Sequence, residues 1–137
     1  MNRFLKIVAA LAILYFVPKI IQHVMLPRPG TIGNDQVVTM VKEINSKLPK
    51  SLGSGTTLRK VEYQASSGLE FFYMLDESAH FDISQKDRVA GGFTTFVCQG
   101  PMKEFVKQGI AITFHTTYPD SGETKSFDTP VHAGQCT

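Results

Sequence analysis

The sequence lacks several features that would assign it to a known chemistry. None of its 12 acidic residues lies before Pro29, and no cysteine precedes Cys98. The missing N-terminal cysteine excludes a lipid-modified amino terminus of the lipoprotein kind. Four of the 14 basic residues precede Pro29, which leaves ten basic and 12 acidic residues and a net charge of −2 for the remainder. Because nucleic-acid affinity comes mostly from phosphate neutralisation, we expect no nucleic acid as a partner.

The first 26 residues contain a long apolar segment, and residues 7–17 in it are uninterrupted apolar residues. Residues 7–26 supply the roughly 20 residues that about 30 Å of hydrocarbon requires, if Lys19 is tolerated near the end of the span. Arg3 and Lys6 precede the segment and favour a cytoplasmic amino terminus. We therefore expect residues 7–26 to contact the lipid bilayer of a bacterial inner membrane in a single pass, with the C-terminal domain in the periplasm.

A cleaved secretory signal is the alternative to a retained anchor. No A-x-A-like pair of small residues follows the apolar core between Tyr15 and Pro29, so the retained anchor is favoured. The predicted organisation is an anchor, or uncleaved signal, over residues 1–26, a Pro- and Gly-rich linker over residues 27–33, and one extracytoplasmic domain over residues 34–137. Cleavage would instead give a secreted periplasmic binding protein.

Hydrophobic periodicity predicts the order helix, strand, turn, strand, repeated once. A helix is expected from Asn34 to about Lys47, with its apolar face formed by Val37, Val41, Ile44 and Leu48. A second helical region is expected over residues 88–108, after a loop over residues 77–87. The predicted strands are Thr57–Ala65, Leu69–Asp76, Ile110–Tyr118 and Thr124–Val131. This order predicts an α+β fold, a two-layer α-β-β-α-β-β domain in which both helices cover one face of a four-stranded antiparallel sheet.

Strand alternation leaves apolar residues on the side of the sheet away from the helices. If Leu69, Phe71 and Tyr73 face the helices, Phe72 and Met74 must face the other way. Alternation in the third predicted strand adds two residues to that side, Thr113 and His115. We expect Phe72, Met74, Thr113 and His115 to bind another envelope protein, because aromatic residues and Met are enriched in interfaces. Coverage of this face by the linker, the long loop or the C-terminal tail is the equally weighted alternative.

Two cysteines in a domain expected to be exported favour a structural disulfide between Cys98 and Cys136, and the Cys-x-x-Cys spacing of a reactive thiol pair is absent. Several short motifs occur along the domain, namely INxxLP at residues 44–49, Thr57 with Leu58, VCxxP at residues 97–101, Gly109, Tyr118, Asp120 and Gly122. Together with the final cysteine they resemble a group of small bacterial envelope proteins that combine an N-terminal membrane segment with a two-cysteine α+β domain. The resemblance implies one export-associated domain with a bridge between the two cysteines, and it implies no activity.

Residues that could carry chemistry do not form a recognised motif. His80, His115 and His132 lack the His-x-x-x-His or His-x-His spacing of a metal site, and no G-x-S-x-G or P-loop sequence occurs. We therefore expect no catalytic residue, metal or cofactor, and an interaction or assembly component of a bacterial envelope complex. The alternative is a minor, hydrolase-like envelope enzyme that uses His115 with an acidic partner. A pocket around His115 would favour the enzyme, whereas a flat apolar face would favour the binding protein.

Overall fold

The computed structural model describes residues 33–136. The predicted anchor at residues 1–26 lies outside the described residues, as does the predicted linker up to residue 32. Across residues 33–136, no helix combines the length and the apolar character needed to cross a bilayer.

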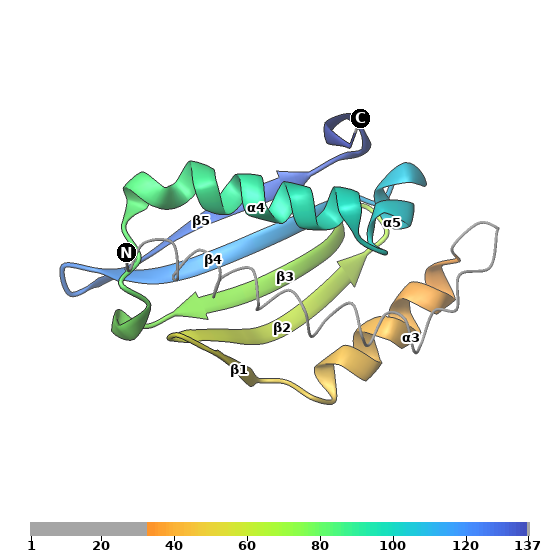
Figure 1. The fold of residues 1–137 in the computed structure, drawn as a ribbon. Coiled ribbons are helices and arrows are strands. Elements are labelled where there is room, and N and C mark those ends of the chain that lie inside the picture. Colours follow the sequence, from red (N-terminus) through yellow and green to blue (C-terminus); the bar gives the residue numbers. More distant parts are fainter. Residues whose placement is uncertain (1–32, 137) are drawn as a thin grey trace.

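The domain is an α+β structure built on one five-stranded sheet (Figure 1). In chain order the strands are β1 (Lys50–Gly53), β2 (Thr56–Gln64), β3 (Gly68–Leu75), β4 (Ile112–Asp120) and β5 (Glu123–Val131). The helices are α3 (Asn34–Asn45), α4 (Lys86–Gln99) and α5 (Lys103–Lys107), with short 3₁₀ turns at η2 (Glu77–Ala79), η3 (Ile83–Gln85) and η4 (Ala133–Gln135). The strands lie side by side in sequence order, so the sheet has β1 at one edge and β5 at the other.

The α+β class was predicted correctly, but the predicted antiparallel sheet is wrong at its centre, where β3 and β4 are parallel. The other neighbouring strands are antiparallel. The reason is the direction of α4, which carries the chain back along the sheet after β3 ends (Figure 1). The strand that follows such a crossover starts at the same end as the strand before it, and is therefore parallel to it.

The fifth strand, β1, was also missed, because the first strand was predicted to begin only at Thr57. Its four residues are too few to show alternation, and they pair with β2 through a tight turn at Ser54 and Gly55. Both turn residues have positive φ angles, of 53° and 76°. β1 thus forms through pairing with β2 at the edge of the sheet, and a local sequence pattern does not reveal such pairing.

The core lies between the sheet and the helices, and both long helices pack on the same face. α3 contributes Val37, Met40 and Ile44, while α4 contributes Phe93 and Val97, all to one buried cluster. The inward strand residues of this cluster are Leu58, Val61, Leu69, Phe71, Tyr73, Ile112, Phe114 and Val131. Two residues predicted on the apolar face of the first helix, Val41 and Leu48, are only partly buried and pack against this cluster. The opposite side of the sheet is therefore free of helices within the described chain.

A side-chain amide joins α3 to the sheet. Asn45 Nδ2 donates to the Val61 carbonyl at 2.7 Å, and the Val61 N–H donates to Asn45 Oδ1 at 2.9 Å. Val61 follows an irregularity of β2 near Arg59, where the pairing with β3 shifts by one residue. Asn45 thus satisfies two backbone groups at a position where the strand ladder is interrupted.

The predicted disulfide between Cys98 and Cys136 is confirmed. It joins the last turn of α4 to the segment after η4, across a sequence separation of 38 residues. Both cysteines are partly buried and pack against the core. The bond therefore fixes the C-terminal segment beside α4 and α5.

Candidate functional site

The candidate site is the side of the sheet that faces away from α3 and α4, which we call the open face. It carries Lys60 and Glu62 from β2, Glu70, Phe72 and Met74 from β3, Thr113, His115 and Thr117 from β4, and Asp128 from β5. The alternation predicted for β3 is observed, because Phe71 and Tyr73 are buried in the core while Met74 is 37% exposed. Phe72 is partly buried and does not belong to the core cluster.

The register of β3 and β4 brings the four predicted partner-binding residues together. Phe72 lies opposite His115, Glu70 lies opposite Thr113, and Met74 lies opposite Thr117. The four therefore occupy one patch on two adjacent central strands. Their role in binding stays a prediction, but their common placement is a feature of the fold.

Phe72 is held between two neighbours on the open face. Its ring stacks on that of His115, with centroids 4.5 Å apart and ring planes 18° apart. The Lys60 Nζ atom lies 4.5 Å from the centroid of the Phe72 ring. Because β3 runs between β2 and β4, these two groups flank Phe72 from opposite sides. A cation over an aromatic face is attractive, so Lys60 helps to fix the ring in position.

His115 joins the three strands β3, β4 and β5 through its two ring nitrogens. Nε2 lies 2.9 Å from Glu70 Oε1, and Nδ1 lies 2.6 Å from Asp128 Oδ1. Ionised carboxylates only accept hydrogen bonds, so both contacts are hydrogen bonds when the ring is protonated on both nitrogens. Partial burial by itself lowers the pKa of His115, but the hydrogen bonds to Glu70 and Asp128 and their negative charges together raise it above its usual value.

Three members of this network, Lys60, Glu70 and Asp128, were not among the predicted site residues. Glu70 could have been placed on the open face, since it has the same parity as Phe72 in its strand. Asp128 could not be placed beside His115, because that neighbourhood depends on β5 pairing with β4. The sequence does not reveal the strand order, and so it could not show that one histidine bridges two carboxylates.

The surroundings of His115 bear on the hydrolase-like alternative. Both ring nitrogens contact carboxylates, so neither is positioned in this structure to accept a proton from a nucleophile. No G-x-S-x-G sequence occurs in the chain, and Thr113 and Thr117 are the hydroxyl residues on the same face of β4 as His115. Within residues 33–136, no group of three or more metal-ligating side chains is arranged to hold an ion.

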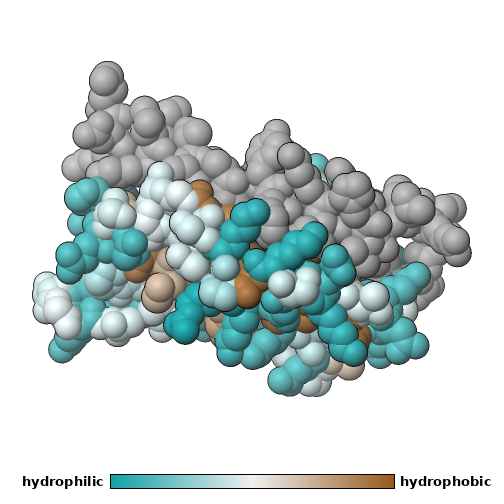
Figure 2. Space-filling view, turned by 90° about the horizontal axis from the view of Figure 1, so that it is seen from below, coloured by the Kyte–Doolittle hydropathy of each residue, from teal (hydrophilic) through white to brown (hydrophobic). Residues whose placement is uncertain are grey.

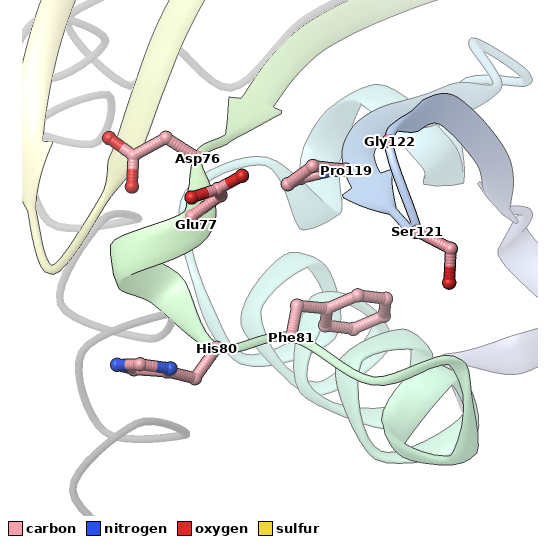
Figure 3. A pocket seen from close by; sticks show the side chains of 7 residues that line it. All are labelled: Asp76, Glu77, His80, Phe81, Pro119, Ser121 and Gly122. Carbon is pink, nitrogen blue, oxygen red and sulfur yellow. The ribbon is translucent and has the colours of Figure 1, made fainter.

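A shallow recess lies at one end of the sheet, away from the open-face network. It is lined by Asp76, Glu77, His80, Phe81, Pro119, Ser121 and Gly122 (Figure 3). The Asp76 carboxylate accepts hydrogen bonds from the Ser78 hydroxyl and, at 2.8 Å, from the Ser78 N–H, which caps η2. The bond from the hydroxyl, and after it the bond from the N–H, holds the pKa of Asp76 below its usual value. Asp76 and His80 point away from Phe81 and Ser121 in Figure 3. The polar groups of the recess therefore do not converge on a common point.

The flank formed by α3 and β1 offers no comparable apolar surface. Figure 2 shows this side largely hydrophilic where the described residues are visible, with small hydrophobic spots separated by polar side chains. Scattered exposed apolar residues are usual on a protein surface and carry no implication of binding. The open face thus remains the candidate site.

Comparison with known proteins identifies the fold. No protein-family model matches the chain, and no curated protein matches it. Two solved structures share the architecture. One is a candidate secreted protein from Pseudomonas aeruginosa, with 17% identity and a TM-score of 0.58 over 75% of this chain and 91% of the other. The second is the pilotin EpsS of the Vibrio vulnificus type 2 secretion system, with 11% identity and a TM-score of 0.57 over 72% of this chain and 86% of the other.

The raised pKa of His115 makes a pH-dependent contribution to stability. A group whose pKa is raised in the folded state stabilises fully below its unfolded pKa, here about 6.5, and loses that contribution as the pH rises through the folded value. We expect His115→Gln to destabilise the domain more at pH 6 than at pH 9 in urea unfolding. The variant also loses the ring stacking on Phe72 at both pH values. An equal loss at the two pH values would show that the carboxylates do not stabilise the protonated ring.

Proposed function

We propose that this protein is a membrane-anchored component of a bacterial envelope assembly and that it binds another envelope protein without catalysing a reaction. In this proposal residues 7–26 anchor it in the inner membrane in a single pass, and the described domain lies in the periplasm. The partner contacts the open face at Phe72 and Met74, with Thr113 and His115 beside them. The observation that carries the proposal is the placement of these four side chains on one patch of the sheet face opposite the helices, where Met74 is 37% exposed.

The physical argument is one of surface composition. A sheet face that is left in water normally carries polar residues, whereas this one presents the partly buried ring of Phe72 and, near the end of the same strand, the exposed side chain of Met74. Burying each of these against a partner could contribute about 1.5–3 kcal/mol before the costs of association. Lys60 and His115 flank Phe72, and Thr57 and Thr117 lie opposite Met74, so the apolar side chains have polar neighbours, as interfaces commonly have.

The likeness to EpsS supports an assembly role in the envelope. That protein is a pilotin of a type 2 secretion system, and the other structural neighbour is described as a candidate for secretion. Both likenesses are consistent with an extracytoplasmic domain, and the disulfide fits the same oxidising location. The occupied nitrogens of His115 favour binding over the hydrolase-like alternative.

The proposal is tested by Phe72→Ala in the full-length protein, with Phe71→Ala as the matched control from the opposite face. We expect Phe72→Ala to lose partner capture from membranes while its free energy of unfolding falls by less than about 1.5 kcal/mol, the scale of one aromatic or cation–π contact. Phe71→Ala should instead destabilise the fold by about 3–5 kcal/mol, because its ring is fully buried.

Partner capture is measured by chemical cross-linking in intact membranes followed by mass spectrometry, and stability by urea unfolding of the purified protein. If Phe72→Ala unfolds as readily as the control, Phe72 is a core residue and the open face is not a binding surface. Unchanged capture by a stable Phe72→Ala variant would contradict the proposal equally.

A further inference from the structure

The two edges of the sheet differ in a way that bears on recognition. β1 has four residues and an irregular register between Ser51 and Gly53, so it is a poor template for another strand. β5 has nine residues, all paired with β4 in a continuous register. Within residues 33–136, no strand pairs with its other edge. β5 is therefore a long, regular edge strand.

The backbone groups on that outer edge can be assigned from the hairpin that joins β4 to β5. Its two-residue turn, Ser121 and Gly122, has φ angles of 53° and 83°, and Asp120 pairs directly with Glu123. A turn of this kind is flanked by a hydrogen-bonded pair, and the pairs then alternate along the ladder.

It follows that the even-numbered residues of β5 direct their N–H and C=O groups outward, away from β4. These are Thr124, Ser126, Asp128 and Pro130. Proline has no N–H and is tolerated in a strand where that group would face solvent, so Pro130 independently fits the assignment. The outer edge thus presents three N–H donors and four carbonyl acceptors to solvent.

The features that commonly keep an edge strand from pairing with another chain are weak in β5. Lys125 is held by Asp120, with 2.7 Å between Nζ and Oδ2, and so lies over the hairpin. Proline interrupts the donors only near the end of the strand. Asp128 is drawn across the open face by His115, although its side chain remains 60% exposed. The residues from Glu123 to Ser126 are all exposed.

We propose that β5 binds an extended segment of an envelope protein as a sixth strand of the sheet. The segment would pair with the outward backbone groups of Thr124, Ser126 and Asp128, and backbone pairing of this kind supplies affinity with little sequence requirement. Charge complementarity defines its chemistry, because the exposed Asp128 carboxylate favours a Lys or Arg opposite it on the open face. This edge adjoins the open face through Asp128, but pairing through the backbone groups of β5 does not require the patch around Phe72.

The test uses a photo-crosslinking phenylalanine derivative placed at Thr124 of the full-length protein in its native membranes, with the same derivative at Val38 on α3 as the position control. We expect the derivative at Thr124 to form one adduct, through one contiguous segment of the attached protein. The derivative at Val38 should not form this adduct. Ser126→Pro should reduce this adduct roughly tenfold, since it removes one outward donor and blocks the edge sterically. Ser126→Thr, which keeps the donor, should leave it unchanged.

Ser126→Lys provides a second variant if Ser126→Pro fails to fold. This substitution keeps the backbone N–H at an exposed position. The lysine cation should also weaken the adduct by repelling the basic segment. Folding of each variant is checked by its oxidised disulfide and its melting temperature. An adduct that consists of two copies of this chain would overturn the assignment in favour of self-association. Absence of an adduct, or an adduct insensitive to both folded variants, would overturn the proposal itself.

Discussion

Replacing Phe114 by alanine should lower the free energy of unfolding by about 3–5 kcal/mol, as large a loss as we expect for Phe71→Ala. Phe114 is fully buried on the inner side of β4. Its ring stacks on that of Phe93 with centroids 4.2 Å apart and on that of Phe71 at 5.3 Å. The substitution therefore leaves a cavity where β3, β4 and α4 meet.

The control for this prediction is Phe72→Ala, the same chemical change on the opposite face of the neighbouring strand. Urea unfolding at neutral pH measures both losses, and the Phe114 variant should lose at least twice as much stability as the Phe72 variant. Similar losses would mean that the two faces of the sheet are buried to a similar extent, and the open face would not then be a free surface.

Cys98→Ser should lower the free energy of unfolding by about 2–5 kcal/mol, because the unfolded chain regains the conformational entropy that the closed loop removes. The loop here spans a sequence separation of 38 residues. On the chain-entropy relation, a loop of this length is worth about 3–4 kcal/mol. Loss of the bond also releases the C-terminal segment, in which Cys136 packs against the core.

Two comparisons isolate the effect of the bond in urea unfolding. Cys136→Ser should reproduce the loss, and complete reduction of the unmodified protein should give the same stability as either variant. Labelling of both thiols in the native, unreduced protein would contradict the disulfide. A Cys98→Ser variant as stable as the unmodified protein would show that the bond does not restrain the unfolded chain.

Local sequence patterns were sufficient to predict the helices, four strands and which face of each strand is buried. Alternation in β3 and β4 is regular, so Phe71 and Phe114 could be assigned to the core and Phe72 and His115 to the opposite face. The strands were recognisable because one face of the sheet is packed and the other is not. Apolar and polar residues therefore alternate along each strand with a period of two.

Long-range arrangement could not be predicted in the same way. The parallel pairing of β3 with β4 depends on where α4 returns the chain, and β1 exists only because β2 offers an edge. For the same reason Glu70 and Asp128 could be seen as charged residues but not as the two partners of His115. A histidine between two carboxylates is a product of strand order and register, and neither is encoded in a local pattern.

Oxidation of Met74 provides the most direct test of the central claim, that the open face binds a partner. Met74 is 37% exposed, whereas Met40 and Met102 are fully buried and serve as internal references. Oxidation to the sulfoxide depends on access of the oxidant to sulfur, and mass spectrometry quantifies it for each residue. The comparison is between native membranes and the purified full-length protein in detergent.

We expect Met74 to oxidise readily in the purified protein and to be protected severalfold in native membranes, while Met40 and Met102 oxidise slowly in both. Phe72→Ala in membranes should restore the oxidation of Met74 by releasing the partner. Equal oxidation of Met74 in membranes and in the purified protein would mean that nothing covers the open face, and it would contradict the account.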